Sequence, residues 1–457
     1  MHIEVRTWAG AGASAVTACA LVLAGLASCD GSSGGGGDAG DLPDTTPPID
    51  GPATDSGSGG SDGGADGAAD GGDPSCAVTP CMVQVTAGLE HACSLAADGK
   101  VFCWGNNLGG QVGTGPGGVV DGGGTDSKSA GLQVMGLGVA KQVTAGYYHT
   151  CALLQDGTVW CWGDNSKGQL AQAADGGAQA PSPSPKQVMG LPMGVTQIEA
   201  GGWHTCALAN GSVTCWGFNA SGQIGTGTGN DAGVSPLVVP TPTQVANLSG
   251  VTDLGLGDQL TCALTGSGPV CFGTNTFGQL GRGGAAGAPP FATAPAAVSG
   301  AAANTTALAK ATGYHQCALS ASGAQCWGRN GAAQLGTGSM SAPMTSPQSV
   351  AGLMNAQEIA PGGNHTCARL QNGSVACWGA NAHGQTGQMP DPDGGVTSPL
   401  NVQGLTNVLQ LASGWADFSC AVVKGGTVWC WGGNYNGQLG RGGNAPQVDN
   451  QPARVVF

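Results

Sequence analysis

Seven copies of a short Cys-Trp-Gly motif constrain this chain more than any other feature of its sequence. The motif recurs every 51 to 58 residues, with Phe in place of Trp in one copy, and its cysteines are Cys103, Cys161, Cys215, Cys271, Cys326, Cys377 and Cys430. Self-similarity at such a period indicates a repeat architecture in which each copy is one supersecondary unit. The whole segment from residue 81 onward must therefore fold as one array.

Each copy contains four short apolar segments that are typical of β-strands. In the second copy they cover residues 142–145, 149–153, 158–162 and 185–188. A four-stranded sheet this small exposes too much apolar surface on its own, so each sheet must bury a face against the next one. Seven copies of four strands predict an all-β fold, a seven-bladed β-propeller of four-stranded antiparallel blades.

The order of the segments also predicts how the ring closes. A Pro-x-x-Val run leads through a short turn into the next Val-Thr-Ala-Gly run, so we expect each blade to begin at Pro-x-x-Val. On this division the first blade lacks its first strand. Residues 452–457, at the other end of the chain, would supply it.

Cysteine spacing gives independent support for the hairpins. Each copy has another Cys nine or ten residues before the motif. The nine-residue spacing of the third copy is centred on Asn210-Gly211, a strong type I′ turn signal, which places Cys206 opposite Cys215. The ten-residue spacing of the second copy puts Gly157 at the left-handed position of a bulged loop. We therefore predict disulfides that join Cys93 to Cys103, Cys151 to Cys161, Cys206 to Cys215, Cys262 to Cys271, Cys317 to Cys326, Cys367 to Cys377, Cys420 to Cys430 and, before the first blade, Cys76 to Cys81.

This use of cysteine indicates an oxidising compartment. A metal site is not expected, because two cysteines per blade on separate sheets cannot close a four-ligand site. An Asp-Pro-Asp-Gly stretch at 391–394 resembles half of a calcium loop, but an Asp-Pro turn in a surface loop explains it equally well.

The first 75 residues carry targeting and linker features. Residues 1–28 are predicted to be a lipoprotein signal peptide, since the Leu-Ala-Ser-Cys run that ends at Cys29 resembles the lipobox of bacterial lipoproteins, in which the cysteine is acylated. Glu4 departs from the usual positive start, so ordinary signal peptidase cleavage is the alternative. Residues 29–75 are predicted to be a lipidated N-terminus followed by a disordered Gly/Asp/Ser-rich tether. We expect an exported protein, anchored through Cys29 at the bacterial cell envelope or surface, with a propeller at 76–457.

The repeats resemble a known family over residues 83–457. The second copy contains the motifs Val-Thr-Ala-Gly at 143–146, His-Thr-Cys-Ala-Leu at 149–153, Trp-Gly at 162–163 and Asn-Ser-Lys-Gly-Gln-Leu at 165–170. These are similar to the regulator of chromosome condensation repeat. The resemblance implies a seven-bladed propeller but no single activity. Eukaryotic members act as guanine-nucleotide exchange factors, and the bacterial beta-lactamase inhibitor protein II resembles this propeller while blocking an enzyme. A nuclear exchange role conflicts with the signal, the tether and the disulfides.

Residues that recur in every copy are interpreted as scaffold, since a functional site should break the symmetry. Asn and Gln recur in all seven copies after the Cys-Trp-Gly motif, and a His recurs in five copies before the first blade cysteine. The turn between the first two segments differs most between copies. Its aromatic residues are the predicted binding residues, because exposed aromatic side chains anchor partners and sugars: Tyr147, Tyr148, Trp203, Tyr314 and Trp415. The alternative is that they pack under the long loops as a second hydrophobic layer.

Charge and motifs exclude several functions. The net charge is −14 with 13 Lys and Arg in 457 residues, which rules out a nucleic-acid footprint. No catalytic motif is present and no carboxylate pair was found at a recurring position, so we expect no enzyme activity and no cofactor. The sequence favours a monomeric binding or scaffold propeller that recognises a protein or glycan partner. The alternatives are an exported carbohydrate-active enzyme, which needs converging carboxylates near the channel, and a passive structural envelope lipoprotein.

Overall fold

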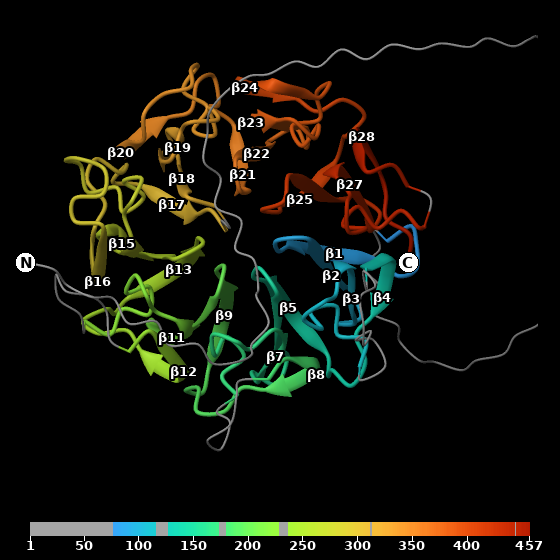
Figure 1. Ribbon diagram of the computed structural model, residues 1–457, viewed down its shortest axis with the longest axis horizontal. Coiled ribbons are helices and arrows are strands. Elements are labelled where there is room, and N and C mark those ends of the chain that lie inside the picture. Colours follow the sequence, from blue (N-terminus) through green and yellow to red (C-terminus); the bar gives the residue numbers. More distant parts are fainter. Residues whose placement is uncertain (1–75, 116–126, 173–179, 228–235, 311–312, 444) are drawn as a thin grey trace, which may run out of the picture. The chain divides into compact units, whose positions relative to one another are not determined.

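The computed structural model describes residues 76–115, 127–172, 180–227, 236–310, 313–443 and 445–457. These residues form seven four-stranded antiparallel sheets arranged around a central axis (Figure 1). Each sheet is built from four consecutive strands, so blade 1 is β1 to β4 and blade 7 is β25 to β28. The predicted seven-bladed propeller is confirmed. The predicted signal peptide, Cys29 and the tether lie outside the described residues.

The four strands of a blade run outward from the axis in chain order. The inner strands are β1 (Met82–Ala87), β5 (Ala140–Ala145), β9 (Val195–Ala200), β13 (Val251–Leu256), β17 (Thr305–Leu308), β21 (Ala356–Pro361) and β25 (Val408–Ser413). The second strands are β2 (His91–Ala96), β6 (His149–Leu154), β10 (His204–Ala209), β14 (Leu260–Thr265), β18 (His315–Ser320), β22 (His365–Leu370) and β26 (Phe418–Val423).

The third strands are β3 (Val101–Asn106), β7 (Val159–Gly163), β11 (Ser212–Phe218), β15 (Gly268–Thr274), β19 (Gly323–Gly328), β23 (Val375–Asn381) and β27 (Thr427–Gly433). The outer strands are β4 (Ser127–Gln133), β8 (Ser182–Gln187), β12 (Val238–Gln244), β16 (Phe291–Ala297), β20 (Met344–Ser349), β24 (Asp391–Asn401) and β28 (Val448–Arg454). The part of the chain that the structure describes contains no helix long and apolar enough to cross a membrane.

The hydrophobic core lies between blades. One core cluster joins Cys93 and Cys103 of blade 1 to Ala152 and Trp162 of blade 2. Trp162 is fully buried, and the corresponding aromatic residue is fully buried in all seven blades: Trp104, Trp162, Trp216, Phe272, Trp327, Trp378 and Trp431. Each blade thus buries its largest side chain against its neighbour, which is what the repeat pattern required.

The predicted disulfides are all present. Cys206 lies directly opposite Cys215 in the β10–β11 pair, with 4.1 Å between their Cα atoms. Asn210 and Gly211 both have positive φ, 50° and 74°, as a type I′ turn requires. Gly157 has φ 85°, the left-handed conformation expected for the longer hairpin loop.

The predicted strand exchange between the chain ends is wrong. Strand β28 pairs with β27 of its own blade, and β4 is the fourth strand of blade 1. The segment after each outer strand is a crossover and not a hairpin turn. Residues 134–139 run from the outer strand of blade 1 to the inner strand of blade 2. Six residues can span about 20 Å, enough to cross three strand spacings of about 4.8 Å.

The C-terminal residues pack beside blade 1 and so connect the last blade to the first. The N–H of Gly131 in β4 donates to the carbonyl of Val456 at 2.7 Å. The Phe457 ring packs edge-on against Trp104, with 5.7 Å between ring centroids. Val455 belongs to the core cluster that blades 1 and 7 share. The last three residues therefore cover the joint between the first and last blades.

Replacing Phe457 with Ala should lower the free energy of unfolding by about 1–2 kcal/mol, because the edge contacts of its ring with Phe102 and Trp104 are lost from this joint. Urea unfolding of the disulfide-bonded protein, followed by Trp fluorescence, measures the change. Val456→Ala is the matched control, since the Val456 side chain is exposed while its backbone bond to Gly131 remains. Equal stability of the two variants would contradict closure through Phe457.

Candidate functional site

A main-chain carbonyl of each blade binds the next blade. The Gln111 carbonyl of blade 1 accepts the indole N–H of Trp162 and the hydroxyl of Thr150, both at 2.9 Å. The corresponding carbonyls accept one or both of these bonds at Gln169, Gln223, Gln279, Gln334, Gln385 and Gln438. The side chains of the recurring Gln and Asn residues hold the same loop, since Asn107 Oδ1 accepts the N–H of Val112 at 2.9 Å. The recurring Gln and Asn are scaffold, as predicted.

The five recurring histidines complete the contact between blades. His91 Nε2 lies 3.0 Å from Thr150 Oγ1 of the next blade. Because that hydroxyl donates its proton to Gln111, the histidine must be the donor and carry its proton on Nε2. Burial lowers the pKa of all five to about 3, so they are neutral at pH 7: His91, His149, His204, His315 and His365.

The hydroxyl is absent from the two joints that lack a histidine. Phe418 replaces the histidine in blade 7, and Ala92 replaces the hydroxyl residue in blade 1. In blade 4 the histidine is replaced by Leu260, and in the next blade the hydroxyl residue is replaced by Gln316. Histidine and hydroxyl are therefore kept or lost together, which supports the structural role that the sequence predicted.

The double substitution His149→Phe/Thr205→Ala, which copies the Phe418 and Ala92 joint, should make the protein less sensitive to acid. The pKa of His149 is lowered from 6.5 to about 3 on folding. Between these pH values the unfolded chain takes up a proton that the folded chain refuses, so stability falls as the pH falls through this range. Removing one such group should reduce the slope by about 1.4 kcal/mol per pH unit. Urea unfolding at pH 7, 6, 5 and 4.5 gives the slope.

Thr205→Ala alone is the control. It keeps the buried His149 and leaves its Nε2–H without the partner now 2.9 Å away. We expect it to lose about 1–3 kcal/mol at pH 7 with no reduction in the slope. A double variant with the slope of the wild type would contradict the neutral state of His149.

A belt of side chains joins the inner strands around the axis. The Gln84 amide bonds both backbone groups of Val143 in the next blade, the N–H and the C=O, each at 3.0 Å. Gln142 bonds Ile198 in the same way, at 2.9 and 2.7 Å. Gln410 of blade 7 bonds both groups of Val85, at 2.5 and 3.0 Å, so the belt also crosses the joint between the last and first blades.

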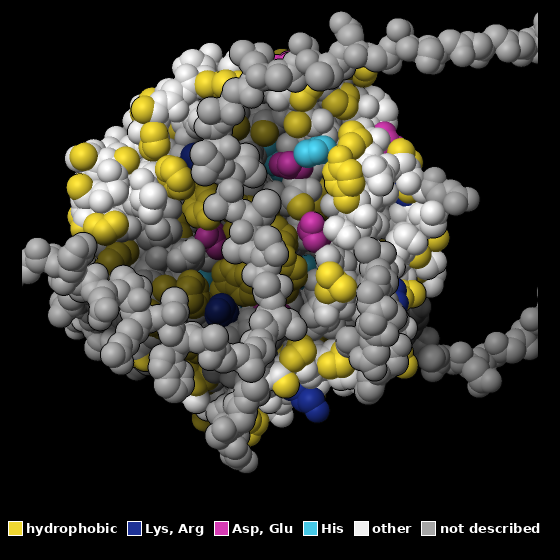
Figure 2. Space-filling model, viewed as in Figure 1, with side chains coloured by type: hydrophobic (Ala, Val, Ile, Leu, Met, Phe, Trp, Pro, Cys, Tyr) yellow, Lys and Arg dark blue, Asp and Glu magenta, His cyan; other side chains and the backbone are white. Residues whose placement is uncertain are grey.

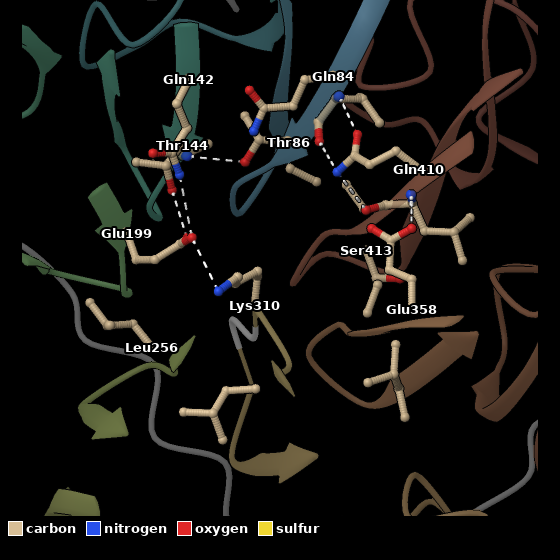
Figure 3. A pocket seen from close by; sticks show the side chains of 18 of the residues that line it. Gln84, Thr86, Gln142, Thr144, Glu199, Leu256, Lys310, Glu358, Gln410 and Ser413 are labelled. Atoms are coloured by element: carbon tan, nitrogen blue, oxygen red, sulfur yellow. Dashed lines mark hydrogen bonds and ion pairs between the residues drawn. The ribbon is translucent and has the colours of Figure 1, made fainter. Parts of the chain in front are cut away.

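The belt encloses a cavity of about 420 Å³ in the channel. Two carboxylates occupy the glutamine position: Asp253 accepts the N–H of Leu308 at 2.8 Å and Glu358 accepts the N–H of Leu411 at 3.1 Å. Figure 3 shows the interactions as an arc from Lys310 through Glu199 and Thr144 to Gln410 and Glu358.

These charged residues were not among the site residues predicted from the sequence. Asp253 and Glu358 stand at one recurring position, the third residue of the inner strand, in blades 4 and 6. Both residues are visible in an alignment of the seven inner strands, but they lie outside the turns in which the copies differ most. Glu199 lies at another position of the inner strand and reaches the same region of the channel.

Two carboxylates do converge in the channel, which is the condition set for the carbohydrate-active enzyme. Lys310 Nζ lies 2.5 Å from Asp253 and 3.6 Å from Glu199. Burial raises the pKa of Glu199 and is opposed by Lys310, and burial raises that of Glu358 to about 7. Asp253 and Glu358 contact the next blade, and Glu199 contacts Thr144 of the preceding blade, so all three carboxylates are assigned to holding the ring together.

The predicted binding residues meet at the end of the channel where the inner strands end. Ring centroids are 5.8 Å apart for Tyr147 and Trp203, 5.1 Å for Tyr147 and Trp415, and 5.1 Å for Tyr314 and Trp415. Tyr148 packs on Trp203 at 5.4 Å. We call these five residues the aromatic cap. Four blades contribute to it, so the structure brings all five together.

The aromatic cap is part core and part surface. Tyr147 is buried, and the other four residues are half-buried. The side chain of Asp258 is buried, and burial raises the pKa of its carboxyl, an effect that the neighbouring Tyr147 and Tyr314 oppose. Figure 2 shows hydrophobic side chains gathered in a hollow around the axis on the face it views. The alternative that these residues form a second hydrophobic layer therefore holds for Tyr147, whereas each of the other four rings is partly exposed.

The Asp-Pro-Asp-Gly stretch forms a turn. Asp391 Oδ1 accepts the N–H of Asp393 at 3.2 Å and that of Gly394 at 3.0 Å. The described ranges contain no group of three His, Cys, Asp or Glu side chains that could hold a metal ion.

Comparison with known proteins places the fold in a family. The family model described as an RCC1-like domain matches residues 122–457, and the model of the regulator of chromosome condensation (RCC1) repeat matches residues 82–111. The chain belongs to the RCC1-like domain family. The resemblance inferred from the repeats is thus confirmed for an RCC1-like propeller.

Relatives of this RCC1-like propeller differ widely in length. The ultraviolet-B receptor UVR8 of Arabidopsis thaliana is 29% identical over 384 residues, which cover 81% of each chain. The probable E3 ubiquitin-protein ligase HERC6 of Homo sapiens is 36% identical over 206 residues, which cover 43% of this chain and 19% of HERC6. The chain thus spans about a fifth of HERC6.

Solved structures show the same fold. Yeast RCC1 (Prp20), in a complex with Kap60, aligns with a TM-score of 0.66 and 21% identity over 83% of this chain and 86% of that one. Human WBSCR16 aligns with a TM-score of 0.66 and 23% identity, covering 78% and 94%.

Proposed function

We propose that this RCC1-like propeller is a binding module that docks a protein partner on the face of the aromatic cap. One observation carries the proposal: half-buried aromatic rings from four blades converge at the axis on a scaffold that is otherwise repetitive. Binding hot spots are enriched in Trp and Tyr near the centre of an interface. Trp203, Tyr314 and Trp415 combine this chemistry with that position.

Charge favours a partner with a basic contact surface. Glu90 and Asp164 lie close enough to Tyr148 to raise the pKa of its hydroxyl, after the larger effect of burial. The propeller at 76–457 has a net charge of −4, from 16 Asp and Glu against 12 Lys and Arg. Complementary charge steers association and selects partners. Among relatives, yeast Prp20p has been studied for its binding to Gsp1p and histones.

Export fits this proposal. We propose a monomeric protein anchored through Cys29 at the bacterial cell envelope or surface, with the tether at 29–75 holding the propeller away from the membrane. The eight disulfides among the described residues support an oxidising compartment.

Tyr148→Ala/Trp203→Ala should weaken partner binding at least tenfold, because truncation of a hot-spot aromatic costs about 2 kcal/mol or more. Partners are captured from an envelope extract on the immobilised protein, and the affinity of the purified partner is then measured for each variant. Near-ultraviolet circular dichroism and thermal unfolding show which variants remain folded.

The matched control is Met189→Ala/Met193→Ala. Both methionines are exposed and lie in the crossover between β8 and β9, at the opposite end of the blades. This control should bind as the wild type does. Loss of binding only in the methionine variant would place the interface on the opposite face, and capture of no partner by the folded wild type would favour the passive envelope protein.

A further inference from the structure

The belt of side chains around the channel is interrupted in one blade. The third residue of the inner strand is Gln, Asp or Glu in six blades, and in blade 5 it is Ala307. The six polar residues are Gln84, Gln142, Gln197, Asp253, Glu358 and Gln410, and each bonds the backbone of the next blade. A methyl group cannot make such a bond, so the backbone of blade 6 lacks this contact.

The unbridged backbone belongs to Ile359. Ile359 pairs with Ala368 just as Val143 pairs with Ala152 and Ile198 with Ala207. At the equivalent positions Val143 and Ile198 point their N–H and C=O out of the sheet edge, where a glutamine amide receives both. Ile359 therefore points its N–H and C=O the same way. Among the residues that the structure describes, no side chain bonds either group.

The cavity reaches this place. Ala307 and Ile359 both line it, and so does Leu319, the β18 residue that pairs with Ala307. The other lining residues all come from the inner strands or directly follow them, so the cavity extends one strand deeper into blade 5 than elsewhere. Strands β17 and β21 barely touch, whereas the other neighbouring inner strands pack against each other. We call this part of the cavity the Ala307 recess.

The chemistry of the belt defines what the recess can bind. A primary carboxamide holds its carbonyl oxygen and one N–H side by side, so it can accept from the N–H and donate to the C=O of one residue, as Gln84 does with Val143. A trans peptide bond points the two groups in opposite directions. We propose that the Ala307 recess is a binding site for a small molecule with a primary carboxamide, which takes the place of the missing glutamine against Ile359. The recess opens into the channel cavity, whose total volume of about 420 Å³ is within the usual size range of small-molecule sites.

Isoleucine-methyl NMR can test this site in the full-length protein. The chain has five isoleucines, Ile3, Ile49, Ile198, Ile224 and Ile359, so each methyl signal can be assigned by substitution. The probe is acetamide, which supplies the atoms that glutamine has beyond the Cβ of Ala307. Acetamide should shift the Ile359 methyl signal saturably and leave Ile198 and Ile224 in place. Acetate can accept from the Ile359 N–H, as Asp253 and Glu358 accept from the next blade, but it cannot donate to the C=O, so it should shift the Ile359 signal less than acetamide at the same concentration.

Two variants give the controls. Ala307→Gln should fill the recess with its own amide, raise the melting temperature and abolish the Ile359 response. Gln142→Ala removes the bridge to Ile198 and should make the Ile198 signal respond to acetamide as well. An unchanged Ile359 signal in the wild type, whatever Ile198 does, would overturn the proposal, as would an acetamide response that survives in Ala307→Gln.

Discussion

The whole ring depends on one repeated contact, in which a glutamine main-chain carbonyl accepts hydrogen bonds from the next blade. At the joint of blades 1 and 2 the donors are Trp162 and Thr150, and the buried His91 supports the hydroxyl. The joint between blades 7 and 1 keeps the indole bond, from Trp104 to Gln438 at 2.9 Å. Because donor and acceptor always belong to different blades, no blade satisfies its buried polar groups alone. This dependence explains why the motif residues recur so strictly.

The features that depend on local geometry could be predicted from the sequence. The period and the four apolar segments predicted the blades, and the turn signal at Asn210-Gly211 predicted the Cys206–Cys215 pair. The closure was predicted wrongly because the segment at 134–139 has a turn-like composition but a crossover's length, and sequence adjacency does not show which sheet a strand joins. The channel carboxylates were missed for a different reason. Their roles depend on the neighbouring blade, which lies more than fifty residues away in the sequence, as the contact of Glu358 with Leu411 shows.

Function is inferred from the places where the repeat is broken. Most recurring polar residues hold the blades together, through the belt or through the carbonyl contacts. Residues that differ between blades are therefore found in the turns and at single positions of the inner strands. The turns carry Trp203 and Trp415 in two blades but Asp258 in another, and the ring of Tyr147 packs against both tryptophans. Ala307 is an exception of the opposite kind, since it removes a contact and leaves space. A symmetric ring thus supplies rigid positions for two asymmetric features, one on a face and one inside the channel.

The most direct test of the central claim, that the aromatic cap is the docking face, is hydrogen exchange of the propeller with and without its captured partner, resolved by mass spectrometry of peptides. The account predicts slower exchange in the turns that carry Tyr148, Trp203 and Trp415, with no change in the crossover that carries Met193. Protection confined to the crossovers, with the cap turns exchanging as in the free protein, would contradict it.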